Sequence, residues 1–241
     1  MGAFAKTSSG RERWSGDARV PRHRHAEAYA ALVLAGHYEE CGSRGRFRVG
    51  PGDILLHDAF DAHLDRFHCR GADILNLPLN SLAEIPFAHG CIGDVDHIVR
   101  IAESDIDVAA TIACLRANRA TRANMDWPDC LADDLVKDPS CRIDALADEY
   151  HLAAETVSRG FRQVFGISPA TFRAEARARR AFDKVVHGLQ SLVEIAAETG
   201  FADQAHMTRA VKALTGMSPG AWRRGSNWFK TQASIRAWMG A

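Results

Sequence analysis

The chain has 241 residues, and its 30 Lys and Arg balance its 30 Asp and Glu. A hydrophobic content of 46% and a charged content of 25% lie in the range of soluble globular proteins. No apolar run approaches the roughly 18–20 residues of a membrane span, and residues 1–15 lack the apolar core of a signal peptide. We therefore expect a cytoplasmic protein of two domains that does not associate with membranes.

The charge is distributed unevenly along the chain. Residues 142–241 contain 14 Lys and Arg against 9 Asp and Glu, whereas residues 1–141 contain 16 against 21. A basic C-terminal part on an acidic remainder indicates that only the C-terminal part binds a polyanion.

The cysteines all lie in the acidic part, and none forms a CxxC pair. They are Cys41, Cys69, Cys91, Cys114, Cys130 and Cys141. In a cytosolic chain we interpret such scattered cysteines as mostly buried small hydrophobic residues. A thiol sensor or a soft-metal site is the alternative.

Residues 20–80 are predicted to form β structure. Short apolar runs at Ala28–Gly36 and Gly52–His63 are punctuated by Gly and Pro. Between them, Arg44–Asp53 alternates charged and apolar residues before a Pro-Gly turn. Short strands with frequent turns favour a small sandwich or barrel.

After about Pro86 the pattern becomes helical. Apolar residues recur at mostly helical spacing, with an interruption near Ser104: Ile98, Ile101, Ile106, Val108, Ile112 and Leu115. This predicts two amphipathic helices, one of them short, which bury an apolar stripe on the β domain or against a second subunit. The next boundary is expected at Thr121–Cys130, where Pro128 can open a helix.

One local pattern occurs twice in the C-terminal part. SRGFRQVFGISP (Ser158–Pro169) parallels TRAVKALTGMSP (Thr208–Pro219), so that a hydroxyl–Arg pair and an apolar stripe precede Gly-x-Ser-Pro in each. An ordinary helical bundle with coincidental caps is the simpler alternative. Two copies in 50-residue register favour a duplicated unit instead.

The second copy is predicted to be a helix-turn-helix. Ser191 with Glu194 makes a capping box for a first helix that ends at Gly200. Asp203 then caps a second helix with a buried stripe of Met207, Ala210, Val211 and Leu214. Two short helices joined by a tight turn that contains glycine have this motif's organisation.

The first copy repeats this organisation. Its supporting helix is predicted at Ile143–Leu152 and its second helix at Ala154–Phe165, with Tyr150-His151 in place of Gly200-Phe201. The first turn is one residue shorter. From Pro169 to about His187 a single helix rich in Ala and Arg connects the copies, and its roughly 19 residues would span about 28 Å.

These residues resemble the AraC/XylS family of transcriptional regulators. The signature-like segment is Glu194–Arg224, and Leu152–Ala181 resembles the first unit and linker helix; the resemblance covers about Pro128–Arg224. It implies a double-stranded DNA operator as partner, and RNA polymerase as a second partner if the protein is an activator. The outward residues that it places at the DNA are Glu155, Thr156, Ser158, Arg159 and Arg162 in the first unit, and Gln204, Ala205, Thr208, Arg209 and Lys212 in the second. Of these, Arg162 and Lys212 suit phosphates.

The N-terminal part resembles the cupin motifs. His23 and His25 match the HxH pair of the first motif, and His63 matches the histidine of the second. The carboxylate position of the first motif falls near Tyr29. Three alternatives stay open: a divalent metal held by the three histidines, a small organic effector bound by these residues and Tyr29, or a domain that mainly dimerises. His57 and His68 are interpreted as ordinary histidines.

The predicted fold class is α+β with two domains. A cupin-like barrel or sandwich occupies 1–90, a helical pair for dimerisation 91–127, an all-α double helix-turn-helix domain 128–225 and a tail 226–241. The predicted function is that of a homodimeric, sequence-specific transcriptional regulator controlled by a small ligand, with no enzymatic activity and no certain cofactor. The alternative is a cupin metalloenzyme, an Fe- or Ni-dependent oxygenase or isomerase that uses the histidine cluster.

Overall fold

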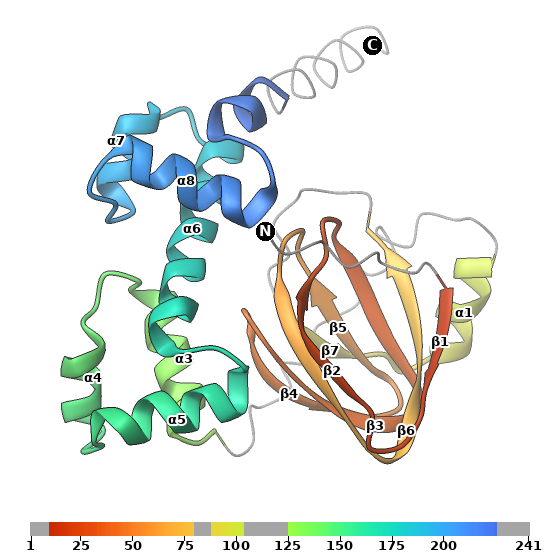
Figure 1. Cartoon of the computed structure of the whole chain (residues 1–241). Helices are drawn as coiled ribbons and strands as arrows, with labels where there is room; N and C mark the ends of the chain where they lie inside the picture. The colour runs from red at the N-terminus through yellow and green to blue at the C-terminus, as the bar shows by residue number, and fades with distance from the viewer. Residues whose placement is uncertain (1–9, 80–87, 104–124, 226–241) are drawn as a thin grey trace, which may run out of the picture. The chain divides into compact units, whose positions relative to one another are not determined.

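The computed structural model describes residues 10–79, 88–103 and 125–225 (Figure 1). Contacts divide the chain into two units. The β unit contains residues up to 130 together with 159–167, and the helical unit contains 131–158 and the residues from 168 onward. Among the described helices, none combines the length and apolarity needed to cross a bilayer.

One antiparallel sheet forms the β unit. Its strands are β1 (Gly10–Trp14), β2 (Arg19–Arg24), β3 (Tyr29–Gly42), β4 (Gly45–Val49), β5 (Asp53–His57), β6 (Ala62–Pro78) and β7 (His89–Cys91). The order across the sheet is β1-β6-β3-β5-β7, with β2 also paired to β6 and β4 to β3. The two long strands β3 and β6 therefore form the centre of the sheet, which is strongly curved (Figure 1).

Strand β3 buries residues on both of its faces. Tyr29 and Val33 belong to one apolar cluster, and Ala30 and Leu32 belong to another, because successive residues of a strand point to opposite sides. The predicted strand at Ala28–Gly36 is confirmed and continues to Gly42. Register shifts on either side of Gly36 accompany its left-handed backbone, with φ of +76°.

Helix α1 (Val95–Glu103) is the first of the two predicted amphipathic helices. Its Ile98 is 1% exposed and belongs to the cluster of Leu32 and Ile54. The first helix thus buries its apolar side on the sheet, one of the two expected arrangements. The predicted second helix, with Ile106 to Leu115, lies outside the described residues.

The remaining helices follow in short succession. They are α3 (Trp127–Lys137), α4 (Ile143–Glu149), α5 (Ala154–Phe165), α6 (Pro169–His187), α7 (Leu192–Glu198) and α8 (Gln204–Thr215). Helix α6 packs against both α7 and α8 (Figure 1). The predicted bounds of α5 and α6 are confirmed, whereas α4 ends three residues before the predicted Leu152.

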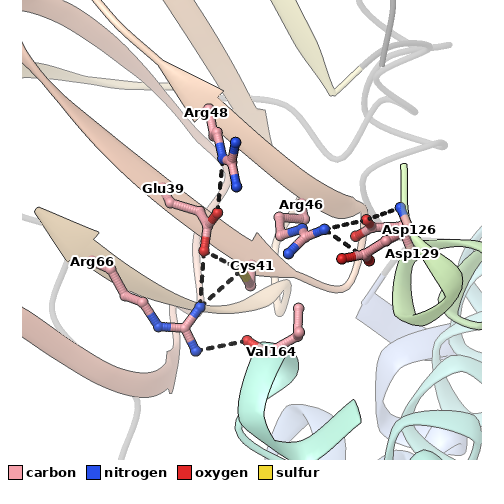
Figure 2. Close-up of polar contacts among 8 residues, drawn as sticks. All are labelled: Glu39, Cys41, Arg46, Arg48, Arg66, Asp126, Asp129 and Val164. Carbon is pink, nitrogen blue, oxygen red and sulfur yellow. Dashed lines mark hydrogen bonds and ion pairs between the residues drawn. The ribbon is translucent and has the colours of Figure 1, made fainter. Parts of the chain in front are cut away.

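Ionic contacts connect the surface of the sheet (Figure 2). Arg48 of β4 and Arg66 of β6 donate hydrogen bonds of 3.1 and 3.0 Å to the carboxylate of Glu39 on β3. Burial alone would raise the pKa of Glu39, but these two guanidinium groups lower it. Arg66 also donates to the main-chain oxygens of Gln163 and Val164 at 2.6 and 2.9 Å, within the same unit.

Glycine at position 160, in the middle of α5, has a packing reason. A Cβ atom there would lie 2.5 Å from the indole ring of Trp127, closer than real Cβ atoms approach. Helix propensity alone would favour alanine at this position by about 1 kcal/mol. The close approach to Trp127 reverses that preference.

Gly160→Ala is therefore expected to lower the free energy of unfolding by about 1–3 kcal/mol, the usual cost of overpacking. Chemical unfolding of the full chain measures the change. Adding Trp127→Phe, which shortens the ring, should recover part of the loss. Greater stability of the single variant would contradict the proposed packing role.

Candidate nucleic-acid interface

The second helix-turn-helix begins at a complete capping box. Ser191 Oγ accepts a hydrogen bond from the Glu194 main-chain N–H at 3.2 Å, and the Glu194 carboxylate accepts one from the Ser191 N–H at 2.7 Å. The main-chain hydrogen bond from Ser191 lowers the pKa of Glu194. The predicted start of this helix is confirmed, and Ile195 and Ala196 form its buried side.

The turns of the two units share a left-handed residue. In the second unit this residue is Gly200, with φ of +74°, and in the first it is His151, with φ of +54°. The residue after each, Phe201 or Leu152, donates its main-chain N–H to the carbonyl five residues earlier at 2.9 Å. The predicted correspondence of Tyr150-His151 with Gly200-Phe201 is thus wrong by one residue, because His151 occupies the glycine position.

Helix α8 separates a packed side from an exposed one. Met207, Val211 and Leu214 are buried, as predicted, whereas Ala210 of the predicted stripe is only half-buried. The side chain of Asp203 caps the helix by accepting from the His206 N–H at 2.6 Å, and Gly216 ends it with φ of +81°. Gln204, Ala205, Arg209 and Lys212 are exposed and Thr208 is half-buried. The exposed side therefore offers an amide, a guanidinium and an ammonium group, with a hydroxyl beside them.

Helix α5 has the same division of residues. Val157, Phe161 and Phe165 are buried, whereas Val164 is only half-buried. The predicted outward residues divide into one half-buried side chain, Thr156, and four exposed ones, Glu155, Ser158, Arg159 and Arg162. Side chains of these kinds, like those on α8, can hydrogen-bond to base edges and phosphates in a major groove.

Two arginines of α6 have a structural role. Arg173 donates to the main-chain oxygen of Cys141 at 2.7 Å, and Arg177 to that of Pro139 at 2.8 Å. The Arg177 guanidinium also lies 5.8 Å from the centre of the Phe201 ring. Arg177 thus contacts both the segment before α4 and the turn of the second unit, a role that the Ala- and Arg-rich pattern did not reveal.

The predicted residues of the N-terminal site come together in the β unit. The ring centres of His23 and His63 are 4.2 Å apart, and those of His25 and His63 are 5.5 Å apart. Tyr29 Oη lies 3.3 Å from His63 Nε2. His23 and His25 are partly exposed, whereas Tyr29 and His63 are 5% and 4% exposed.

The structure adds two residues that the sequence motifs did not indicate. His57 stacks on Tyr29, with ring centres 4.3 Å apart, and its Nε2 lies 3.5 Å from a carboxylate oxygen of Glu40. Both residues are 5% exposed, so the interpretation of His57 as an ordinary histidine is incomplete. The pairing of strands brings His57 to this site, because Tyr29 lies opposite His57 in the β3–β5 register. The sequence motifs do not contain this information.

Comparisons with known proteins identify the C-terminal part. Residues 146–225 match a family model described as a helix-turn-helix domain. The virulence regulon transcriptional activator VirF of Yersinia enterocolitica is 31% identical over 78 residues, which make up 32% of this chain and 29% of VirF. The transcriptional activator RhaS of Escherichia coli is 29% identical over 115 residues, 46% of this chain and 39% of RhaS.

A solved structure is similar over most of the chain. The structure of ToxT from Vibrio cholerae aligns with 90% of this chain and 97% of its own, at 9% identity and a TM-score of 0.43. The matches to VirF and RhaS, in contrast, span less than two-fifths of the length of those relatives.

The fold is α+β, with an antiparallel β domain followed by a helical helix-turn-helix domain. Residues 146–225 are thus similar to a helix-turn-helix domain family and to the transcriptional activators VirF and RhaS, in agreement with the resemblance seen in the sequence.

Asp203→Ala should lower the free energy of unfolding of this domain by about 1 kcal/mol, because the N–H of His206 loses its acceptor. Asp203→Asn keeps a side-chain oxygen at the cap and is the matched control, expected to retain most of the stability. Urea unfolding of the full chain measures both. Equal losses in the two variants would show that the cap hydrogen bond is not the cause.

Proposed function

We propose that the chain is a sequence-specific transcriptional regulator in which each monomer reads two successive major grooves. The observation that carries this proposal is the duplicated unit: α5 and α8 each have a buried apolar stripe and an outward hydroxyl–Arg pair, whose arginine is exposed in both. Helix α6 connects the copies with 19 residues, or about 28 Å of helix. That length is close to the ~34 Å that separates successive major grooves on one face of DNA.

The residues of α8 have distinct roles in this proposal. Gln204, Thr208 and Arg209 contact base edges, since Gln suits adenine and Arg suits guanine. Ala205 offers only a methyl contact, and Lys212 binds a phosphate because its single charge carries no base preference.

Helix α5 reads the second groove in the same way. Glu155, Ser158 and Arg159 contact bases, and a glutamate there would accept a hydrogen bond from cytosine. Thr156 lies beside them and Arg162 binds a phosphate. All of these side chains except Thr156 are exposed in the free protein, which supports the assignment because exposed side chains can reach DNA without leaving packed positions.

Control by a ligand completes the proposed function. A small effector binds among His23, His25, Tyr29 and His63, and the protein acts as a cytoplasmic homodimer through residues 91–127, with RNA polymerase as a partner if it activates. Ligand binding shifts the population of dimer arrangements and so alters how the DNA-reading helices are presented. The support is the convergence of these four side chains in the β unit.

Arg209→Ala is expected to weaken operator binding by about 1–3 kcal/mol and to relax specificity at one base position, because a bidentate contact is lost. Gel shifts with the full chain on the operator, located by genomic footprinting, measure both effects. Lys137→Ala removes an equal charge from α3, outside the two reading helices, and should leave specificity unchanged. Unaltered binding by the Arg209 variant would refute the assignment of this helix face.

Lys212→Ala should weaken binding nearly equally on all sequences and reduce the slope of log affinity against log salt by about 1. A salt titration on operator and random DNA tests this. Loss of specificity with an unchanged salt slope would instead place Lys212 at a base.

A further inference from the structure

A group of buried polar side chains in the β unit lies next to the predicted effector site. Glu40, His57 and His63 each offer one ligand atom, and these atoms all lie within 4.8 Å of one another. All three residues are buried. They come from β3, β5 and the start of β6, and they line one small pocket. The three candidate ligands therefore all lie on strands, and turn residues such as Ser43 and Arg44 complete the lining of the pocket.

Two buried nitrogen atoms of this group have no hydrogen-bond partner. They are His57 Nε2 and His63 Nδ1. His57 Nε2 lies 3.5 Å from Glu40 without making a hydrogen bond to it. Leaving such atoms unsatisfied costs about 1–3 kcal/mol each, so buried polar groups are normally paired. An ion bound at the cluster would accept the lone pair of His57 Nε2 and would also bind the carboxylate of Glu40, which lies 3.5 Å from it.

Glu40 differs from its neighbour Glu39 in a way that favours a cation. Glu39 points to the opposite face of β3, where Arg48 and Arg66 neutralise it (Figure 2). Glu40 has only His57 as an ion-pair partner among the described residues. This carboxyl group lacks the positive charge that its neighbour has.

Other charged residues lie around the pocket. Arg44 also lines the pocket, but its guanidinium is paired with Asp58 at 2.9 Å. Asp61 and Asp65 are buried nearby, so the surroundings of the site include two further carboxyl groups.

Gly42 keeps the space beside His63 open. It lies opposite His63 in the β3–β6 register, and a Cβ atom there would lie 2.9 Å from His63 Cβ and from the Ala62 carbonyl oxygen. A larger residue would therefore push the ring of His63 or fill the pocket. The arrangement is a cavity with nitrogen and oxygen donors on its walls.

We propose that Glu40, His57 and His63 bind one divalent transition-metal ion, such as Zn²⁺, Ni²⁺ or Fe²⁺. Two imidazoles and one carboxylate are a ligand set that these ions prefer, and they leave positions for water or a further ligand. The site is distinct from the set of His23, His25 and His63 that the sequence motif indicates, because two of its ligands lie outside that motif. His63 is common to both sets.

The ion deepens the proposed function, because it makes the regulatory ligand a divalent metal. This regulatory role rests on the proposed function, whereas the metal-binding site itself does not. Loss of metal binding with intact DNA binding would refute this inference alone. Metal binding by a chain that binds no DNA would refute the proposed function alone.

The test is Zn²⁺ titration of the metal-free full chain by calorimetry, with metal content measured after dialysis. The expected stoichiometry is one ion per chain. Glu40→Gln and His57→Gln should each weaken Zn²⁺ binding by more than the 10–100-fold that loss of an outer-shell partner costs. His68→Gln, which changes an exposed histidine outside the site, is the matched control and should bind as the parent does.

Alternative sites give different results. Asp53, His89 and Cys91 form another candidate cluster, in which both His89 Nε2 and Cys91 Sγ lie close to Asp53 Oδ1. Co²⁺ bound there would show a sulfur-to-metal absorption band, which the proposed site lacks. That band, or loss of binding in Cys91→Ser, would overturn the proposal. So would loss of binding in His23→Gln and His25→Gln with no effect of the Glu40 and His57 variants.

Thermal unfolding separates ligand loss from misfolding. Zn²⁺ should raise the unfolding midpoint of the parent, because it binds the native state. Glu40→Gln should unfold cooperatively without this shift. If that variant does not fold, His57→Gln and the Co²⁺ spectrum of the parent still decide the matter. An unchanged parent midpoint at saturating Zn²⁺, with no heat of binding, would refute the site.

Discussion

The pairing of β3 with β6 is the constraint on which the β unit depends. It sets Glu40 opposite Asp65 and Gly42 opposite His63, while the other edge of β3 sets Tyr29 opposite His57. Because side chains alternate between faces, a slip of one residue in this register would move each of these groups to the other side. The polar cluster and the apolar cluster around Tyr29 therefore require the same register, and neither can form without the other.

The helical part follows local rules instead. Ser168, Ser191 and Asp203 cap α6, α7 and α8, and left-handed residues such as Gly200 and Gly216 form turns or helix ends. Each of these features involves residues within about five positions of one another, so the sequence predicted the bounds of α5 and α6 directly. The regular caps leave the exposed faces of α5 and α8 free to vary in chemistry without loss of fold.

Long-range contacts are what the sequence could not predict. The motif resemblance indicated His23, His25 and His63, but Glu40 and His57 carry no motif and meet only through strand pairing. Gly160 likewise lowers the helix propensity of α5, and the ring of Trp127 that accounts for it lies far away in the sequence. The role of His151 as the left-handed residue was missed because histidine replaces glycine there, at a backbone cost that the turn must offset.

The two candidate sites differ in how they couple to the fold. Residues such as Arg209 on α8 are exposed, so their replacement changes DNA recognition with little effect on stability. Glu40, His57 and His63 join three strands, and an ion bound by them would bind only when those strands are paired. The free energy of ion binding would then add to the free energy of unfolding of the domain. A metal at this position would therefore stabilise the folded domain.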